Sequence, residues 1–230
     1  MPLHWFFQAK NGGVMGTRTY GQHCGLAAAM DLLGQRWSLL IIRDLTPGPR
    51  RFTDLFDGLP GIATDVLAER LRELEAAGVI VHRSTRHPVP AKLYSLTASG
   101  EELSVIASRL ADWGMPLLPA VPSANAKVRA RWALQTMTRH YVGGLAAGDY
   151  ELTIDGEELC VSVGHRMATL RYGPALGPAV VRLRCSARQF FSAVKDPGYL
   201  SVARRGLEIE GDLEVAQGFL RALPLRAEAA

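Results

Sequence analysis

Residues 50–96 read RRFTDLFDGLPGIATDVLAERLRELEAAGVIVHRSTRHPVPAKLYSL, and this stretch decides the fold of the first half of the chain. Its opening residues predict a short helix, which a Leu-Pro-Gly turn at 59–61 ends. A second helix is expected over residues 64–77, because its leucines recur on one face at helical spacing. Gly78 ends this helix, since glycine commonly follows the last helical turn.

The rest of the stretch predicts a β-hairpin. Two β-prone runs, 79–81 and 93–96, enclose a polar, basic tip at 83–92. Helix, turn, helix and hairpin in this order form a winged helix-turn-helix, which lays its second helix in a DNA major groove and its hairpin tip along the backbone or in the minor groove. We therefore expect double-stranded operator DNA as a partner.

The charge distribution supports DNA binding locally but not globally. Residues 15–114 carry 11 basic and 11 acidic side chains, whereas residues 115–230 carry 14 and 11, so the net charge of +4 does not come from the winged helix. Within the predicted hairpin, residues 79–96 hold three basic side chains and no acid. A local basic cluster of this kind is typical of phosphate contact.

Composition and cysteine spacing indicate the class of protein. With 230 residues, 48% of them apolar, the chain can bury one or two cores. Its cysteines are far apart and lack CxxC spacing, so neither a disulfide framework nor a metal site is expected. No run of 18 apolar residues occurs, and the opening residues do not resemble a signal peptide. We expect a cytoplasmic protein with no membrane partner, in which residues 1–21 are an N-terminal extension.

Further helices are predicted on both sides of the central stretch. Residues 22–45 predict two helices that break at Gly34, and the second is apolar nearly all round, which indicates a core helix with Trp37 packed inside. Residues 99–113 predict a helix whose apolar stripe requires a partner surface. That stripe consists of Leu103, Ile106, Leu110 and Trp113.

Several segments carry a family resemblance. They are Cys24, Leu33–Ile41, Gly48–Phe52, Leu59–Ile62, Leu71–Ile80, and Tyr94–Thr97 through Ala111–Trp113. Together they resemble the HxlR family of bacterial winged-helix transcriptional regulators, over about residues 22–114. The resemblance implies a homodimer that forms through the first and last helices of this half, roughly residues 24–33 and 99–113.

The winged helix predicts which residues touch DNA. Thr64, Asp65 and Arg72 face away from the leucine stripe, where Arg72 can bind guanine bidentately and Asp65 can accept from cytosine or cap the helix. Phosphate contacts are expected from side chains at the start of the first helix or beside the hairpin tip. These are Arg50, Arg51, Thr53, Arg83, Arg86 and Lys92. A solvated helix face and a solvated basic loop are the alternatives. Family members often carry Ser where this chain has Ala63, which removes one possible cap.

Cys24 has two interpretations. It stands at a helix start, where a thiol with a lowered pKa reacts with oxidants or electrophiles, and in some HxlR relatives a cysteine at the matching place senses them. It can equally be a small apolar residue that packs at a dimer interface. Packing is the default expectation.

The second half predicts a separate domain. Residues 115–126 form a proline-rich linker, and residues 127–230 predict an α+β domain in which helices back a sheet. A helix over residues 128–145 precedes two strands that join at Asp155-Gly156, and further strands and two helices follow.

The end of this domain, residues 206–212 and the amphipathic helix after them, resembles the sterol-carrier-protein fold, over residues 150–224. That fold holds an apolar ligand between its sheet and its helices. The resemblance therefore implies a small apolar or aromatic ligand, and seven residues are candidates for lining its pocket. They are Met137, Tyr141, Phe190, Phe191, Val194, Leu200 and Phe219. The same side chains can also fill an ordinary core.

Enzyme signatures are absent from the sequence. It has no Gly-x-Ser-x-Gly elbow, Walker loop, His-Glu-x-x-His motif or dinucleotide fingerprint, so no catalytic residue or cofactor is predicted. We expect a dimeric bacterial regulator whose DNA binding responds to an apolar or aromatic ligand in the second domain. The alternative is a regulator-derived carrier or co-opted biosynthetic enzyme that no longer depends on DNA.

Overall fold

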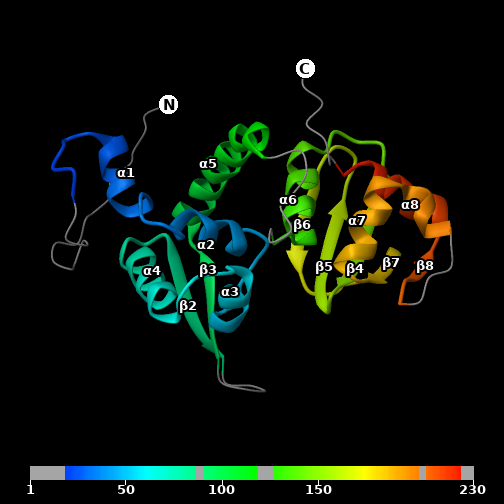
Figure 1. Ribbon diagram of the computed structural model, residues 1–230, viewed down its shortest axis with the longest axis horizontal. Coiled ribbons are helices and arrows are strands. Elements are labelled where there is room, and N and C mark those ends of the chain that lie inside the picture. Colours follow the sequence, from blue (N-terminus) through cyan, green and yellow to red (C-terminus); the bar gives the residue numbers. More distant parts are fainter. Residues whose placement is uncertain (1–18, 86–90, 119–126, 202–205, 224–230) are drawn as a thin grey trace. The chain divides into compact units, whose positions relative to one another are not determined.

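The computed structural model describes residues 19–85, 91–118, 127–201 and 206–223. The chain divides into two compact units, Met1–Thr46 with Arg50–Ser108, and Pro47–Pro49 with Arg109–Ala230. Both units combine helices with an antiparallel or mixed sheet, and each has its own apolar core. The fold is therefore α+β with a winged helix-turn-helix in its first unit (Figure 1).

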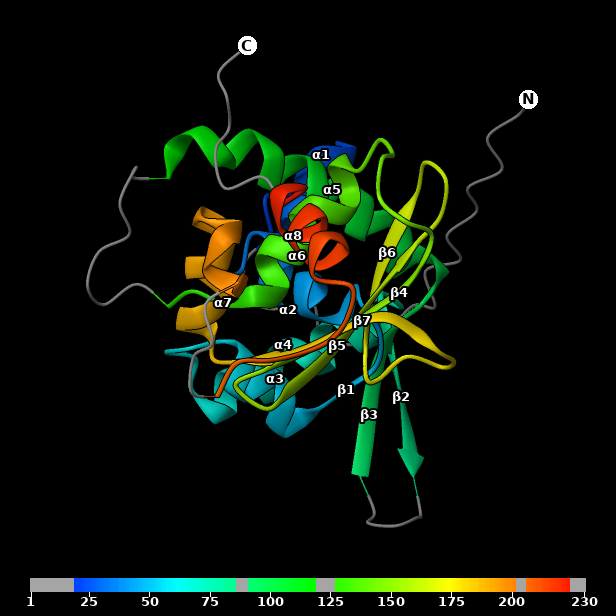
Figure 2. The same cartoon turned by 90° about the vertical axis from the view of Figure 1, so that its right-hand side faces the viewer.

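The first unit contains most of the predicted helices and a three-stranded sheet in the order β1-β3-β2. Its elements are α1 (Gly25–Leu33), α2 (Ser38–Leu45), β1 (Arg50–Arg51), α3 (Phe52–Gly58), α4 (Thr64–Ala76), β2 (Ile80–Thr85), β3 (Ala91–Leu96) and α5 (Ala98–Gly114). Helix α5 begins in the first unit and ends in the second, and a 3-10 turn, η1 (Met115–Leu117), follows it. Figure 2 shows β2 and β3 as one long hairpin, the wing of the fold.

The core of the first unit explains why these segments fold together. Ile41, Ile42 and Leu45 of α2 meet the leucine stripe of α4, and all are nearly inaccessible to solvent. At the end of α4, Gly78 adopts φ +71°, and its amide and the next donate to the carbonyls of Glu75 and Leu74 at 2.9 Å each. A left-handed glycine cap of this kind turns the chain directly from α4 into the wing.

Two expectations for the first unit were wrong in detail. Arg50 and Arg51 do not open a helix, because their backbones pair with Tyr94 and Leu93 of β3, and α3 begins only at Phe52. Trp37 is only partly buried against the core, and it caps the start of α2 with φ +86°, which is unusual for a residue with a side chain.

The second unit is a five-stranded sheet in the order β6-β5-β4-β7-β8. Its elements are α6 (Ala130–His140), β4 (Gly148–Ile154), β5 (Glu157–Val163), β6 (Ala168–Tyr172), β7 (Ala179–Cys185), α7 (Ala187–Lys195), η2 (Pro197–Ser201), β8 (Glu208–Gly211) and α8 (Leu213–Arg221). Strands β4 and β7 are parallel and the other pairs are antiparallel. The three α-helices pack on one face of the sheet (Figure 1).

Local sequence explains the ends of the elements in this unit. The predicted Asp-Gly turn is confirmed, since Asp155 and Gly156 both have positive φ and join β4 to β5 in the manner of a type I′ hairpin. The predicted helix over residues 128–145 is too long, because α6 ends at His140. Gly143 and Gly144, at φ +124° and +97°, cannot continue a helix in that conformation.

Candidate nucleic-acid interface

Helix α4 presents a polar face to solvent. Thr64, Asp65 and Arg72 are all exposed, as the helical projection predicts. The other arginine of the helix, Arg70, is buried and forms ion pairs with Glu69 and Glu73. Arg72 is thus the exposed arginine of this helix. An arginine side chain can bind a guanine edge bidentately.

The amino end of α4 has no side-chain cap. The N-cap residue is Ala63, whose side chain accepts no hydrogen bond, and the acid in the first turn is Asp65. First-turn amides of an α-helix lack intrahelical partners, and their partial positive charge attracts anions such as phosphate. This end of α4 can therefore receive a phosphate group from DNA.

The three-stranded sheet sorts the basic candidates onto two faces. Arg51 of β1 and Arg83 of β2 both pair with Leu93 of the central strand, so their side chains project from the same face. Two strand spacings separate them, about 10 Å. Both residues are exposed. They form a row of positive charge that the sequence could not show, because Arg51 and Arg83 lie in different predicted clusters.

The opposite face of the sheet turns toward the core. Arg50, Tyr94 and His82 form the next row of paired residues, with Tyr94 packed against the core and Arg50 half-buried. Lys92, two residues before Tyr94, shares this face but is exposed near the tip. Thr53 is exposed in the first turn of α3, where Asp54 already accepts a hydrogen bond from the Arg51 amide at 3.0 Å. The predicted contact Arg86 lies outside the described residues.

The contact between Glu75 of α4 and His82 of the wing was not predicted from the sequence. Glu75 Oε1 lies 2.6 Å from His82 Nδ1 and accepts from the His82 amide at 3.1 Å. The Thr97 hydroxyl also donates to the carbonyl oxygen of Gly78 at 2.6 Å. Burial raises the pKa of the nearby Tyr94 phenol, and the Glu75 carboxylate raises it further. These contacts hold the wing at a defined position relative to α4.

The stripe of α5 is largely exposed, as expected of an interface. Ile106, Leu110 and Trp113 are 62%, 49% and 69% accessible, whereas Leu103 packs against the core instead. On α1, Leu26 is 72% accessible. These exposed side chains form apolar surface on both helices that the family resemblance assigns to the dimer.

Cys24 differs from the other two cysteines in its environment. It is exposed at the N-cap of α1, where backbone amides of Ala27 and Leu26 lower the pKa of its thiol. Cys160 and Cys185 are buried, and burial raises the pKa of Cys185 to about 12. At neutral pH, Cys24 has the largest thiolate fraction of the three.

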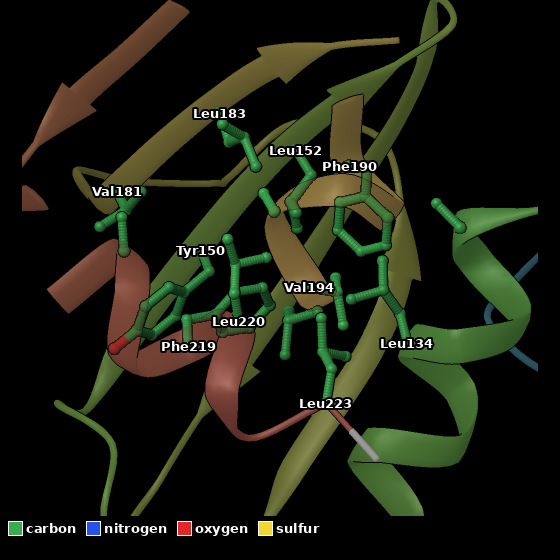
Figure 3. Close-up of a cluster of buried hydrophobic side chains, with 14 of the residues drawn as sticks. Leu134, Tyr150, Leu152, Val181, Leu183, Phe190, Val194, Phe219, Leu220 and Leu223 are labelled. Atoms are coloured by element: carbon green, nitrogen blue, oxygen red, sulfur yellow. The ribbon is translucent and has the colours of Figure 1, made fainter. Parts of the chain in front are cut away.

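The seven candidate ligand residues lie in or against the core of the second unit. Figure 3 labels Phe190, Val194 and Phe219 among the side chains of this core. Met137, Phe190, Val194, Leu200 and Phe219 are buried, while Tyr141 and Phe191 are partly buried against them. The rings of Phe219 and Tyr150 stack at 4.7 Å between centroids. A cavity beside them has about 10 Å³, room for one water at most. The side chains around Phe219 therefore fill the space between α8 and the sheet.

The described residues contain neither a metal-binding cluster nor a membrane-spanning helix. Within the described ranges, no group of three or more His, Cys, Asp and Glu side chains is arranged to hold a metal ion. No helix in the part of the chain that the structure describes is long and apolar enough to cross a membrane.

Comparisons with known proteins match the winged-helix part of the chain. The model of the HxlR-like helix-turn-helix family matches residues 32–121. An uncharacterized HTH-type transcriptional regulator of Synechocystis sp. is 41% identical over 87 residues, which are 37% of this chain and 64% of that protein. The HTH-type transcriptional regulator YodB of Bacillus subtilis is 39% identical over 89 residues, 38% of this chain and 79% of YodB. The structure of reduced YodB superposes with a TM-score of 0.38 at 30% identity, over 44% of this chain and 100% of that one.

Proposed function

Because the chain belongs to the HxlR-like helix-turn-helix family, we propose that it is a DNA-binding transcriptional regulator that acts as a homodimer and responds to a small apolar or aromatic ligand in its second unit. The observation that carries the proposal is the exposed polar face of α4 together with the basic row of Arg51 and Arg83 on the outer face of the three-stranded sheet. This arrangement pairs a helix for the major groove with cations for the flanking backbone.

The residues of α4 and the wing have different roles in this proposal. Thr64, Asp65 and Arg72 read base edges from the exposed face of α4. The strongest phosphate contacts come from Arg51 and Arg83, because both are exposed on the same face of the sheet. Further phosphate contacts come from Arg50, Thr53, Arg86 and Lys92.

Two half-sites require two copies of the chain. The exposed apolar side chains of α1 and α5, among them Leu26, Ile106 and Trp113, support a homodimer through these helices. A symmetric dimer places two α4 helices against two half-sites of an operator, which multiplies the affinity of either one alone.

The ligand response is proposed for the second unit because its sequence resembles the sterol-carrier-protein fold, and a sheet with helices on one face is compatible with that resemblance. Drug-sized ligands occupy about 300–1,000 Å³. A ligand beside Phe219 must therefore separate α8 from the sheet, since the cavity between them has about 10 Å³. We propose that this change of packing alters the DNA binding of the regulator when the ligand binds.

The test of DNA binding is fluorescence anisotropy with DNA from upstream of the protein's own gene, repeated between about 50 and 200 mM salt. Arg51→Ala should weaken binding on all sequences and reduce the salt slope by about one. Arg72→Ala should cost about 1–3 kcal/mol on the cognate site alone. Arg188→Ala, which removes an exposed arginine of α7, is the control and should change neither. Equal losses in all three variants, or no binding by the unaltered protein, would refute the proposed interface.

A further inference from the structure

A second hollow lies on the surface of the second unit, outside the core. It has a volume of about 450 Å³ and is formed by two loops, one between α6 and β4 and one between β5 and β6. Its lining residues are Val142, Gly143, Gly144, Leu145, Ala147, His165 and Arg166. The volume falls in the range of small-molecule sites, in contrast to the filled interior.

Hydrogen bonds hold the two loops that form the hollow. The Leu145 amide donates to the Tyr141 hydroxyl at 3.1 Å, and the Tyr150 hydroxyl donates to the Ala146 carbonyl at 2.9 Å. On the other loop, the Gly164 amide donates to the Met167 carbonyl at 2.8 Å. Hydrogen bonds therefore hold the backbone of both loops that bound the hollow.

The loops also touch each other at a glycine. Gly143 has φ +124°, and a Cβ at this position would lie 3.1 Å from the His165 carbonyl oxygen. That separation is closer than Cβ atoms ordinarily come to a carbonyl. A glycine at this position therefore lets the two walls approach each other, and a larger residue would push them apart.

The side chains that line the hollow are mostly apolar, and one of them, Arg166, carries a positive charge. Val142 is 78% accessible, and Leu145 and Ala147 extend the apolar surface. Arg166 and His165 supply the ionisable groups of the wall, which contains no acid. Among the described residues, no carboxylate forms an ion pair with Arg166. An exposed guanidinium beside apolar side chains suits a ligand that has a carboxylate and an apolar chain.

We propose that this hollow binds a small apolar carboxylate, as a site separate from the interior pocket predicted for the second unit. The Arg166 guanidinium pairs with the carboxylate, and Val142 and Leu145 cover the apolar chain. The binding is a property of the second unit and does not depend on DNA.

The test is a titration of the full-length, ¹⁵N-labelled protein with octanoate and, in parallel, with 1-octanol, which has the same chain without the charge. Octanoate should shift the amide signals of Gly143 and Gly144 and bind about two- to fivefold more tightly than octanol, the range expected of an exposed ion pair. Arg166→Ala should remove that difference, whereas Arg188→Ala, the same change outside the hollow, should leave it intact. Both arginines are exposed, so neither substitution should unfold the unit.

Three results would overturn the proposal. One is octanol binding as tightly as octanoate, and another is an unchanged octanoate affinity in Arg166→Ala. The third is octanoate shifts at Phe190 and Ala193 in the core without shifts at the two glycines, which would place the ligand in the interior pocket instead. The interior pocket fails separately if octanol shifts no core signal.

Discussion

The ion pair between Arg131 and Glu157 offers a direct test of how the second unit is held together. Arg131, in the first turn of α6, is 1% accessible, and its Nη1 lies 3.0 and 2.9 Å from the two carboxylate oxygens of Glu157 at the start of β5. The pair links a helix to the sheet that it covers. The substitution Glu157→Gln keeps the size of the side chain and removes its charge.

The burial of Arg131 sets the expected magnitude. Breaking a buried ion pair by neutralising one partner costs about 3–5 kcal/mol, because the buried partner loses the opposite charge that it faces. The Glu157 side chain is 21% accessible, so some solvent reaches the site and the lower end applies. We therefore expect the free energy of unfolding to fall by about 3 kcal/mol, or the urea midpoint by about 1.5 M at an m-value of about 2 kcal/mol/M.

A second ion pair of the same unit provides the matched control. Arg182 Nη1 and Glu210 Oε2 are 3.1 Å apart, but the two side chains are 45% and 73% accessible. Glu210→Gln should cost less than about 1 kcal/mol, since water screens the pair. Urea unfolding of the full chain is followed by far-UV circular dichroism and tryptophan fluorescence, with separate transitions allowed for the two units. Equal midpoint shifts in the two variants would refute the argument from burial.

Three other predictions concern the first unit and α5. Because its pKa is lowered, the Cys24 thiol should react with iodoacetamide at pH 7 at least about tenfold faster than Cys160 or Cys185, as measured by mass spectrometry, and equal labelling would contradict this. Leu110→Glu should convert the proposed homodimer to a monomer without unfolding it, because Leu110 is exposed, and a dimer in sedimentation would rule out this interface. Gly100→Ala should destabilise the first unit by about 1–3 kcal/mol, because the added methyl group would clash with the Val79 carbonyl oxygen. This loss is expected although alanine is the better helix former, and an unchanged melting temperature would refute the clash.

The sequence by itself determined the elements that depend on nearby residues. The leucines of α4 recur with the helical period, so the exposed positions of Thr64 and Arg72 followed from spacing alone. The Asp155-Gly156 turn likewise fixed the pairing of β4 with β5, because only certain residues adopt positive φ there. Such features depend only on residues that are close together in the sequence, so the sequence alone predicts them.

Only the tertiary structure decided the features that join distant residues. Arg51 and Arg83 share a face because both pair with Leu93, and no local pattern around either residue reveals a common partner. The links of Glu75 to His82 and of Arg131 to Glu157 also join separate elements. The interior of the second unit is the clearest example. Aromatic residues at the same positions can line a pocket or fill a core, and the sequence does not distinguish the two, because the volume left between them depends on how closely the helices pack on the sheet.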